Sequence, residues 1–146
     1  MISRMVLDTN VLSELMRPHP DARVVAWFAG RAETGFLITA ITRAEILLGI
    51  ELLPPGRRKE ALAEAASQMF SEEFDRRCLP FDEQATDIYA GIVAARTRAG
   101  QPISTEDAQI AAIALAQGLP LATRNTRDFA NIEGLRTLDP WLDDSF

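Results

Sequence analysis

The sequence predicts an α/β fold in which a central, mostly parallel sheet is flanked by helices. Short apolar runs of strand length alternate with longer segments of helical periodicity, and glycine, proline or helix-capping residues lie between them. The chain has 146 residues, of which 47% are hydrophobic, so it can bury one sizeable core. We therefore expect a single domain spanning residues 1–146, without internal repeats or linkers.

The first half of the chain is predicted to contain two short strands and four helices. The strands are expected at 5–7 and 36–39, and the helices at 10–17, 22–29, 42–53 and 57–78. Pro18 ends the first helix, Gly30 ends the second, and the Pro-Pro-Gly turn at 54–56 ends the third, because these residues disfavour a continued helix. The fourth helix is amphipathic and is expected to pack one face against the core.

The second half is predicted to contain three short strands and two helices. The strands are expected at 79–81, 119–122 and 135–138, the helices at 83–99 and 105–117, and a helical turn at 127–131. Gly100 and Gly118 close the two helices. Strands that alternate with helices in this way pair in parallel, because each crossover returns the chain to the same edge of the sheet.

An acidic composition with few reactive side chains excludes several classes of function. The net charge is −6, so the chain repels nucleic acid unless a cation or a local arginine patch reverses the field. With Cys78 the only cysteine and His19 the only histidine, an internal disulfide and a cysteine-cluster metal site are excluded, and histidine-based catalysis is disfavoured. No membrane-length apolar stretch or signal peptide is visible, so we expect a cytoplasmic protein without membrane contact.

Four carboxylates lie where an α/β protein places its chemistry. Asp8 follows the first predicted strand, Asp128 follows the strand at 119–122, and Glu45 and Asp107 lie in the first turns of helices. Each also has a structural interpretation, because Asp commonly caps helices. Glu45 follows Thr42 by three residues, and Asp107 follows Ser104 by three, which is the spacing of a capping box.

The set of acids is harder to explain by capping than any one of them. Glu45 shares its helix face with Ile41, Leu48 and Leu52, and Asp107 shares its face with Ile103, Ile110, Ala111 and Ala114. No basic residue lies on those faces to neutralise the acids. Because strand ends and helix starts share one edge of a parallel sheet, the acids are expected to converge and to bind a hard cation, Mg²⁺ or Mn²⁺. Such a site can activate water for phosphodiester hydrolysis.

Four segments carry a resemblance to a known family. They are Val6-Leu7-Asp8-Thr9-Asn10-Val11-Leu12, Thr42-Arg43-Ala44-Glu45, the stretch 103–112 (Ile-Ser-Thr-Glu-Asp-Ala-Gln-Ile-Ala-Ala) and the stretch 123–129 (Thr-Arg-Asn-Thr-Arg-Asp-Phe). In this order they resemble the motifs of PIN-domain toxins from bacterial toxin–antitoxin pairs, of the VapC type and in particular its FitB-like branch. Each motif is loose alone, but the ordered set spans nearly the whole chain and is specific.

The resemblance implies a PIN fold and an endoribonuclease that depends on Mg²⁺ or Mn²⁺. It implies that Asp8, Glu45 and Asp107 are the metal-binding, catalytic acids. Many family members carry a further acid where this chain has Asn125, so either Asn125 or the catalytic candidate Asp128 fills the fourth position. Supporting roles beside the site are expected for four polar residues: Thr9, Asn10, Thr123 and Asn125.

The resemblance also implies partners. It implies an RNA substrate, a homodimer, and a cognate antitoxin that holds the toxin inactive, with a higher assembly of toxin and antitoxin as a further expectation. An antitoxin that inserts an Arg or Lys among the clustered acids would neutralise the site. Three arginines near the motifs, Arg43, Arg124 and Arg127, are candidates for phosphate contacts, although exposed arginines often serve only as solvated surface.

The sequence leaves open two alternative functions from other classes of protein. A haloacid-dehalogenase-like phosphatase would use Asp8 as a nucleophile, but such enzymes carry a second Asp two residues later, where this chain has Asn10, and a downstream lysine. The only lysine here is Lys59, in a helical surface context. A non-enzymatic regulatory binding module would use all four acids structurally and would bind its partner through exposed apolar helices.

Overall fold

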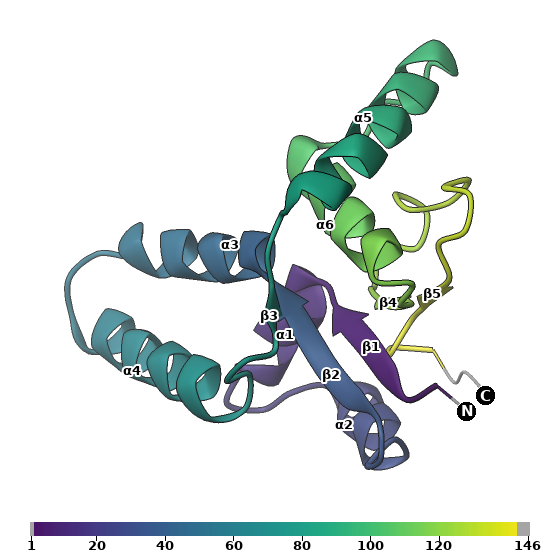
Figure 1. The fold of residues 1–146 in the computed structure, drawn as a ribbon. Helices are drawn as coiled ribbons and strands as arrows, with labels where there is room; N and C mark the ends of the chain where they lie inside the picture. The colour runs from purple at the N-terminus through teal and green to yellow at the C-terminus, as the bar shows by residue number, and fades with distance from the viewer. Residues whose placement is uncertain (1, 143–146) are drawn as a thin grey trace.

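The structure is a computed structural model that describes residues 2–142, so both ends of the domain expected for 1–146 lie outside the described residues. A five-stranded parallel sheet with strand order β3-β2-β1-β4-β5 forms its centre (Figure 1). The strands are β1 (Arg4–Leu7), β2 (Gly35–Thr39), β3 (Cys78–Leu79), β4 (Leu121–Ala122) and β5 (Thr137–Leu138). The predicted α/β class with a parallel sheet is confirmed.

Six helices connect the strands and cover both faces of the sheet (Figure 1). They are α1 (Thr9–Leu15), α2 (Ala22–Ala29), α3 (Ala40–Glu51), α4 (Arg57–Glu72), α5 (Glu83–Arg98) and α6 (Thr105–Ala116). Helices α3 and α4 form a hairpin on one side of the sheet, and α5 packs closely along α6 on the other. In the part of the chain that the structure describes, no helix has the length and apolar character needed to cross a bilayer.

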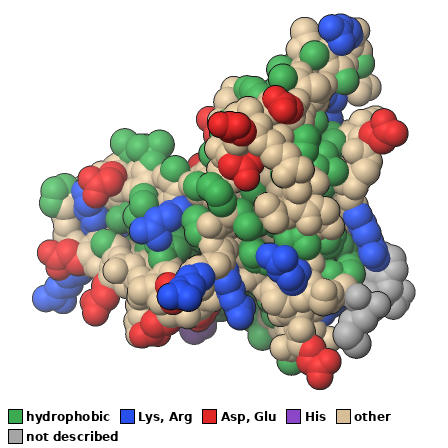
Figure 2. Space-filling view, in the orientation of Figure 1, with side chains coloured by type: hydrophobic (Ala, Val, Ile, Leu, Met, Phe, Trp, Pro, Cys, Tyr) green, Lys and Arg blue, Asp and Glu red, His purple; other side chains and the backbone are tan. Residues whose placement is uncertain are grey.

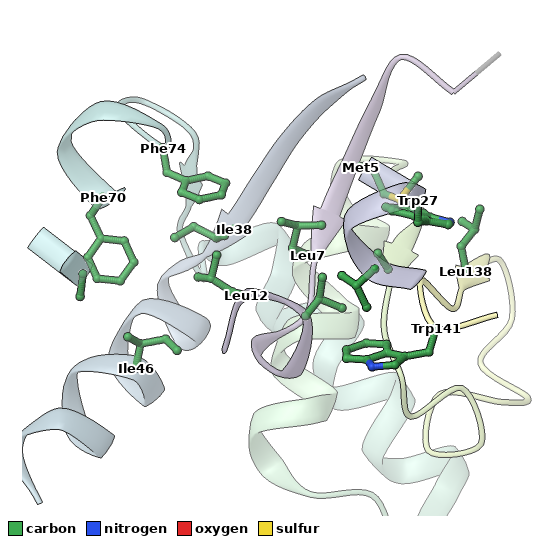
Figure 3. Close-up of a cluster of buried hydrophobic side chains, with 14 of the residues drawn as sticks. Met5, Leu7, Leu12, Trp27, Ile38, Ile46, Phe70, Phe74, Leu138 and Trp141 are labelled. Carbon is green, nitrogen blue, oxygen red and sulfur yellow. The ribbon is translucent and has the colours of Figure 1, made fainter. Parts of the chain in front are cut away.

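The alternation of side chains along β1 builds two cores, one on each face of the sheet. Met5 and Leu7 pack into the cluster shown in Figure 3, together with Trp27 of α2 and Trp141 near the chain end. Val6 points the other way, into a cluster formed mainly by α5, α6 and the segment after β4. Because successive strand residues face opposite sides, a three-residue apolar run is enough to join both cores.

The order of the strands reverses direction at β1. The chain passes from β1 to β2 and β3 on one side, and then crosses through α5 and α6 to β4 on the other side of β1. Val6 pairs with Leu121, and Leu7 with Ala122, so β1 and β4 end together. In open parallel sheets such a reversal of strand order is the usual location of a ligand site, at the carboxyl ends of the strands.

Several predicted boundaries were wrong, by six residues at the end of α4 and by one or two residues in most other elements, and the turn predicted at 127–131 is not helical. Helix α4 ends at Glu72 rather than at residue 78, because the chain then turns through Arg76, whose φ of 59° is left-handed, and Cys78 enters the sheet opposite Ile38. The amphipathic pattern continued past the true end because Phe74 is buried in the same core as α4. Helix α3 begins at Ala40 rather than at residue 42, directly after β2.

Candidate active site

Asp8 is the central carboxylate at the ends of β1 and β4. It is only 3% exposed, and three groups of the chain hold its two oxygens. The Thr9 amide donates to Oδ1 at 2.8 Å, and the Thr123 hydroxyl and the Asn10 amide group donate to Oδ2 at 2.7 and 3.2 Å. Burial raises the pKa of Asp8, although the hydrogen bonds from Thr123 and Thr9 act in the opposite direction. Asp8 therefore caps α1 and also lies where the sequence predicts the site, at the ends of β1 and β4.

Asn10 and Thr123 link the two strand ends around Asp8. The Asn10 side-chain oxygen accepts a hydrogen bond from the Arg124 amide at 3.1 Å. The Thr123 hydroxyl, besides donating to Asp8, accepts one from the Asn125 amide at 3.0 Å. The two residues fix the start of the segment after β4 relative to the start of α1, as the sequence predicted for supporting residues of the site.

Glu45 is joined to this centre by a hydrogen bond from the hydroxyl of Thr9, at 2.6 Å between Oγ1 and Oε1. Thr9 also lies 2.9 Å from the hydroxyl of Thr42, which lies 3.4 Å from that of Thr39. Since Thr9 gives its proton to Glu45, Thr42 must donate to Thr9. The result is a directed chain of hydroxyls that ends on the Glu45 carboxylate.

The interpretation of Thr42 and Glu45 as a capping box is wrong. The expectation that Glu45 lies on a buried apolar stripe of its helix is also wrong. Thr39, not Thr42, caps α3, by accepting a hydrogen bond from the Thr42 amide at 3.1 Å. Leu48 and Leu52, expected on a buried stripe with Glu45, are 59% and 75% exposed. The roles of Thr39 and Thr42 were missed, although a threonine that ends a strand directly before a helix is a recognisable cap signal.

Asp107 lies in the first turn of α6, where Ser104 caps the helix by accepting a hydrogen bond from the Asp107 amide at 3.1 Å. Desolvation raises the pKa of its carboxyl to about 6, and the negative charges of Asp8, Asp128 and Glu45 contribute to this rise. Four acids from four segments of the chain therefore act on one another electrostatically. This convergence is the arrangement that the sequence predicted.

Asp128 and Asn125 lie on the loop after β4 and differ in how they relate to the other acids. The charge of Asp128 reaches Asp107, whereas Asn125 contacts the centre through its backbone amide. Both side chains are exposed. On charge alone, Asp128 is the better match for a fourth acid.

Within residues 2–142, no basic side chain forms a recorded ion pair with these acids. The recorded ion pairs join Arg17 to Glu14 and Arg23 to Asp21, and neither includes one of the four acids. A cluster of carboxylate and hydroxyl oxygens without a cation of the chain suits a hard divalent ion such as Mg²⁺ or Mn²⁺. Within the described residues, no group of three or more Asp, Glu, His or Cys side chains is arranged closely enough to hold a metal ion as it stands. The fit therefore rests on the donor chemistry and the charge of the cluster.

Two of the three candidate arginines are placed by the structure. The Arg124 guanidinium lies 4.8 Å from the ring centre of Trp141. The Arg43 guanidinium lies over the ring of Phe70 on α4, at 4.5 Å. Figure 2 shows that acidic side chains also gather at the base of the projection formed by α5 and α6. Of the two, only Arg124 belongs to a segment tied to the centre, because its backbone amide donates to the Asn10 side chain.

Comparisons with known proteins agree with this geometry. The family model described as PIN domain matches residues 5–135. Toxin FitB of Neisseria gonorrhoeae is 41% identical over 138 residues, which cover 94% of this chain and 99% of FitB. The VapC ribonuclease Y4jK of Sinorhizobium fredii is 37% identical, over 93% of this chain and 96% of that protein. In the solved structure of FitAB bound to an IR36 DNA fragment, a chain with 38% identity aligns with a TM-score of 0.87, over 97% of this chain and 99% of its own length.

Proposed function

The chain belongs to the PIN domain family, and from this premise we propose that it is a divalent-metal-dependent endoribonuclease that acts as the toxin of a toxin–antitoxin pair. The observation that carries the proposal is the convergence of Asp8, Glu45, Asp107 and Asp128 at the carboxyl ends of the strands, without a basic partner. Relatives of comparable length that are named as a toxin and as a ribonuclease support the same activity.

We assign the metal to Asp8, Glu45 and Asp107, with Mg²⁺ or Mn²⁺ as the ion. When bound, the ion polarises the scissile phosphate and lowers the pKa of a water. Asp8 is held rigidly by its three hydrogen bonds and serves as the fixed ligand. Asp128, on the exposed loop, contributes the fourth negative charge.

Glu45 is the residue best placed to orient the attacking water and accept its proton. The Thr9 hydroxyl holds Oε1, and no hydrogen bond to Oε2 occurs in residues 2–142, so one carboxylate oxygen stays available. The hydroxyls of Thr42 and Thr39 behind Thr9 fix the direction of the hydrogen bond that Thr9 donates to this carboxylate. Proton acceptance at Oε2 of Glu45 completes the role of this residue in hydrolysis.

The phosphatase alternative receives no support from the site. The Asn10 side chain donates a hydrogen bond to Asp8 and accepts one from the Arg124 amide, and an amide cannot act as an acid. Lys59 donates to the backbone oxygen of Glu51 at the exposed end of α3. Asp8 also points both oxygens at hydrogen-bond donors, which suits a ligand better than a free nucleophile.

Removal of the divalent ion is expected to abolish cleavage. Purified protein with Mn²⁺ should cut a structured RNA, excess EDTA should stop the reaction, and added Mn²⁺ in excess over EDTA should restore it, because the acids repel one another and the phosphate without a cation. The measurement is the rate of product formation on denaturing gels. Equal cleavage with and without EDTA would contradict the proposal, provided that an Asp8→Asn preparation purified in parallel shows no contaminating ribonuclease.

Arg124 is expected to contact an RNA phosphate next to the cut. Its backbone amide binds Asn10 beside Asp8 and its guanidinium stacks on Trp141, and a cation on this segment would offset the repulsion of the substrate. Arg124→Ala should raise KM roughly fivefold with a smaller change in kcat. Arg43→Ala is the matched control, because that side chain lies over Phe70 and should leave KM unchanged. An equal effect of both substitutions on KM would argue against a specific contact.

The proposed partner is an antitoxin that inserts a basic side chain into the acid cluster. Four negative charges that attract a cation offer the same field to an Arg or Lys of a bound protein. The FitAB structure to which this chain aligns is described as bound to DNA, and an analogous complex is proposed here. We also propose that the chain forms a homodimer in this complex.

A further inference from the structure

Arg96, in the last turn of α5, binds two separate segments of the chain through three backbone oxygens. Its Nε donates to the oxygen of Gln101 at 2.8 Å, Nη1 to that of Ala130 at 3.0 Å, and Nη2 to that of Asp128 at 3.0 Å. A guanidinium carries five N–H groups in a rigid plane, so a single side chain can satisfy all three oxygens at once. No other side chain could make the same set, since lysine presents one nitrogen.

The end of α5 holds this guanidinium in place. The Gln101 amide donates to the Arg96 oxygen at 2.9 Å and the Gly100 amide to the Thr97 oxygen at 3.1 Å, which is the bonding pattern of a Schellman motif. Gly100 supplies the required left-handed residue, with φ of 68°. Gln101 therefore binds both the backbone and the side chain of Arg96, and this closed ring fixes the direction of the two Nη atoms.

The two segments held by Arg96 each lead to a carboxylate of the candidate site. Gln101 lies three residues before Ser104, the cap of the helix that begins with Asp107 in its first turn. The other oxygens belong to Asp128 itself and to Ala130, which flank the buried Phe129. Within the loop, the Asp128 amide donates to the Asn125 oxygen at 3.0 Å and the Ala130 amide to the Arg127 oxygen at 3.2 Å, and Phe129 packs in the core.

We propose that Arg96 is a positioning residue that sets the placement of Asp128 relative to Asp107. The inference rests on the proposed function, because it assigns both acids to the reaction. Arg96 touches no reacting atom and acts only through backbone oxygens. Displacement of a reacting group by about 1 Å can lower a rate on the order of a hundredfold, so a fixed separation of the two acids matters for turnover.

The test compares Arg96→Met with Arg96→Lys and with Arg98→Met. Methionine keeps most of the aliphatic length of the arginine side chain but donates no hydrogen bond. Lysine keeps the charge, but its single nitrogen cannot bind all three oxygens. Arg98 lies exposed on the same last turn of α5, so its replacement controls for loss of charge there. All variants are assayed at least 15 °C below their melting midpoints, so that a folded population is compared throughout.

The expected result is a loss of kcat that depends on Asp128. Arg96→Met should lower kcat ten- to hundredfold with KM within about twofold, Arg96→Lys should recover little, and Arg98→Met should match the parent. In an Asp128→Asn background, Arg96→Met should change kcat less than about twofold, because the acid it positions is already gone. An equal loss in both backgrounds, or no loss in either, would overturn the inference.

A second readout is independent of cleavage and separates this inference from the proposed function. Hydrogen exchange of the backbone amides in residues 125–131, measured on the metal-free protein, should be about tenfold faster in Arg96→Met than in Arg98→Met, because the loop loses two of its ties. Unchanged exchange would overturn the role of Arg96 even if the protein cleaves RNA. Faster exchange in a protein without ribonuclease activity would support the tether and contradict only the proposed function.

Discussion

Replacement of Asp8 by asparagine is expected to lower the rate of RNA cleavage roughly a thousandfold, which corresponds to about 4 kcal/mol of transition-state stabilisation. Asn keeps the shape of the side chain, and its oxygen can still accept the hydrogen bond that the Thr9 amide now gives to Oδ1. What is lost is the negative charge at the position where the strands β1 and β4 end. The measurement is kcat with saturating Mn²⁺, together with the Mn²⁺ affinity by calorimetry.

Asp21→Asn provides the matched control for this substitution. Asp21 also caps a helix, α2, but both of its oxygens are bound by Arg23, which holds the pKa of that carboxyl at about 2. It belongs to no part of the candidate site, and its replacement should leave cleavage within about twofold. If the two Asp→Asn variants lost activity equally, helix capping rather than metal chemistry would explain the role of Asp8. Unchanged Mn²⁺ binding and unchanged melting in Asp8→Asn would favour the non-enzymatic module.

Asp107→Asn is expected to have two opposite effects, a large loss of activity and a gain in stability of the metal-free protein. The pKa of Asp107 is raised to about 6 in the folded state, from the ordinary value of 3.8. Between these values the folded protein binds more protons than the unfolded chain, so stability falls as the pH rises from about 4 to above 6. At neutral pH the charged carboxylate therefore lowers the stability of the folded protein, and asparagine removes this destabilising charge.

The stabilisation should be on the order of 1 kcal/mol, because the carboxyl is partly exposed and solvent screens its repulsion. For a chain of this size that corresponds to a rise of roughly 4 °C in the melting midpoint at pH 7, and to almost none at pH 4. In excess Mn²⁺ the parent protein should instead have the higher melting midpoint, since only the parent is stabilised by binding the ion. Destabilisation by Asp107→Asn at pH 7 without metal would show that the carboxylate serves the fold rather than a cation.

The main features of the site could be predicted because local sequence determines where strands end. An apolar run followed by Asp8 or by Thr123 puts a polar side chain at the edge of a parallel sheet, whatever the rest of the chain does. The convergence of Asp107 followed from the same rule, because helix starts lie at that edge. These placements depended on one element each, and the structure has the residues at that edge; their roles in a site stay predictions.

Features that depend on distant partners could not be predicted. Glu45 was placed in the site by an apolar stripe that is in fact exposed at Leu48 and Leu52, and what brings it there is the hydroxyl of Thr9, 36 residues earlier. The tie from Arg96 to Asp128 spans 32 residues and leaves no local pattern. Such contacts depend on how helices pack against each other, which the periodicity of a single helix does not specify.

The strand order has a consequence for the synthesis of the protein. The middle strand β1 comes first along the chain, but its neighbour β4 begins only at Leu121. A growing chain that has not yet reached this point carries Asp8 without the hydroxyl of Thr123 that holds it, and without Asp128. The cutting centre therefore cannot assemble until most of the chain has left the ribosome. An incomplete chain that ends before β4 is therefore expected to leave RNA uncut.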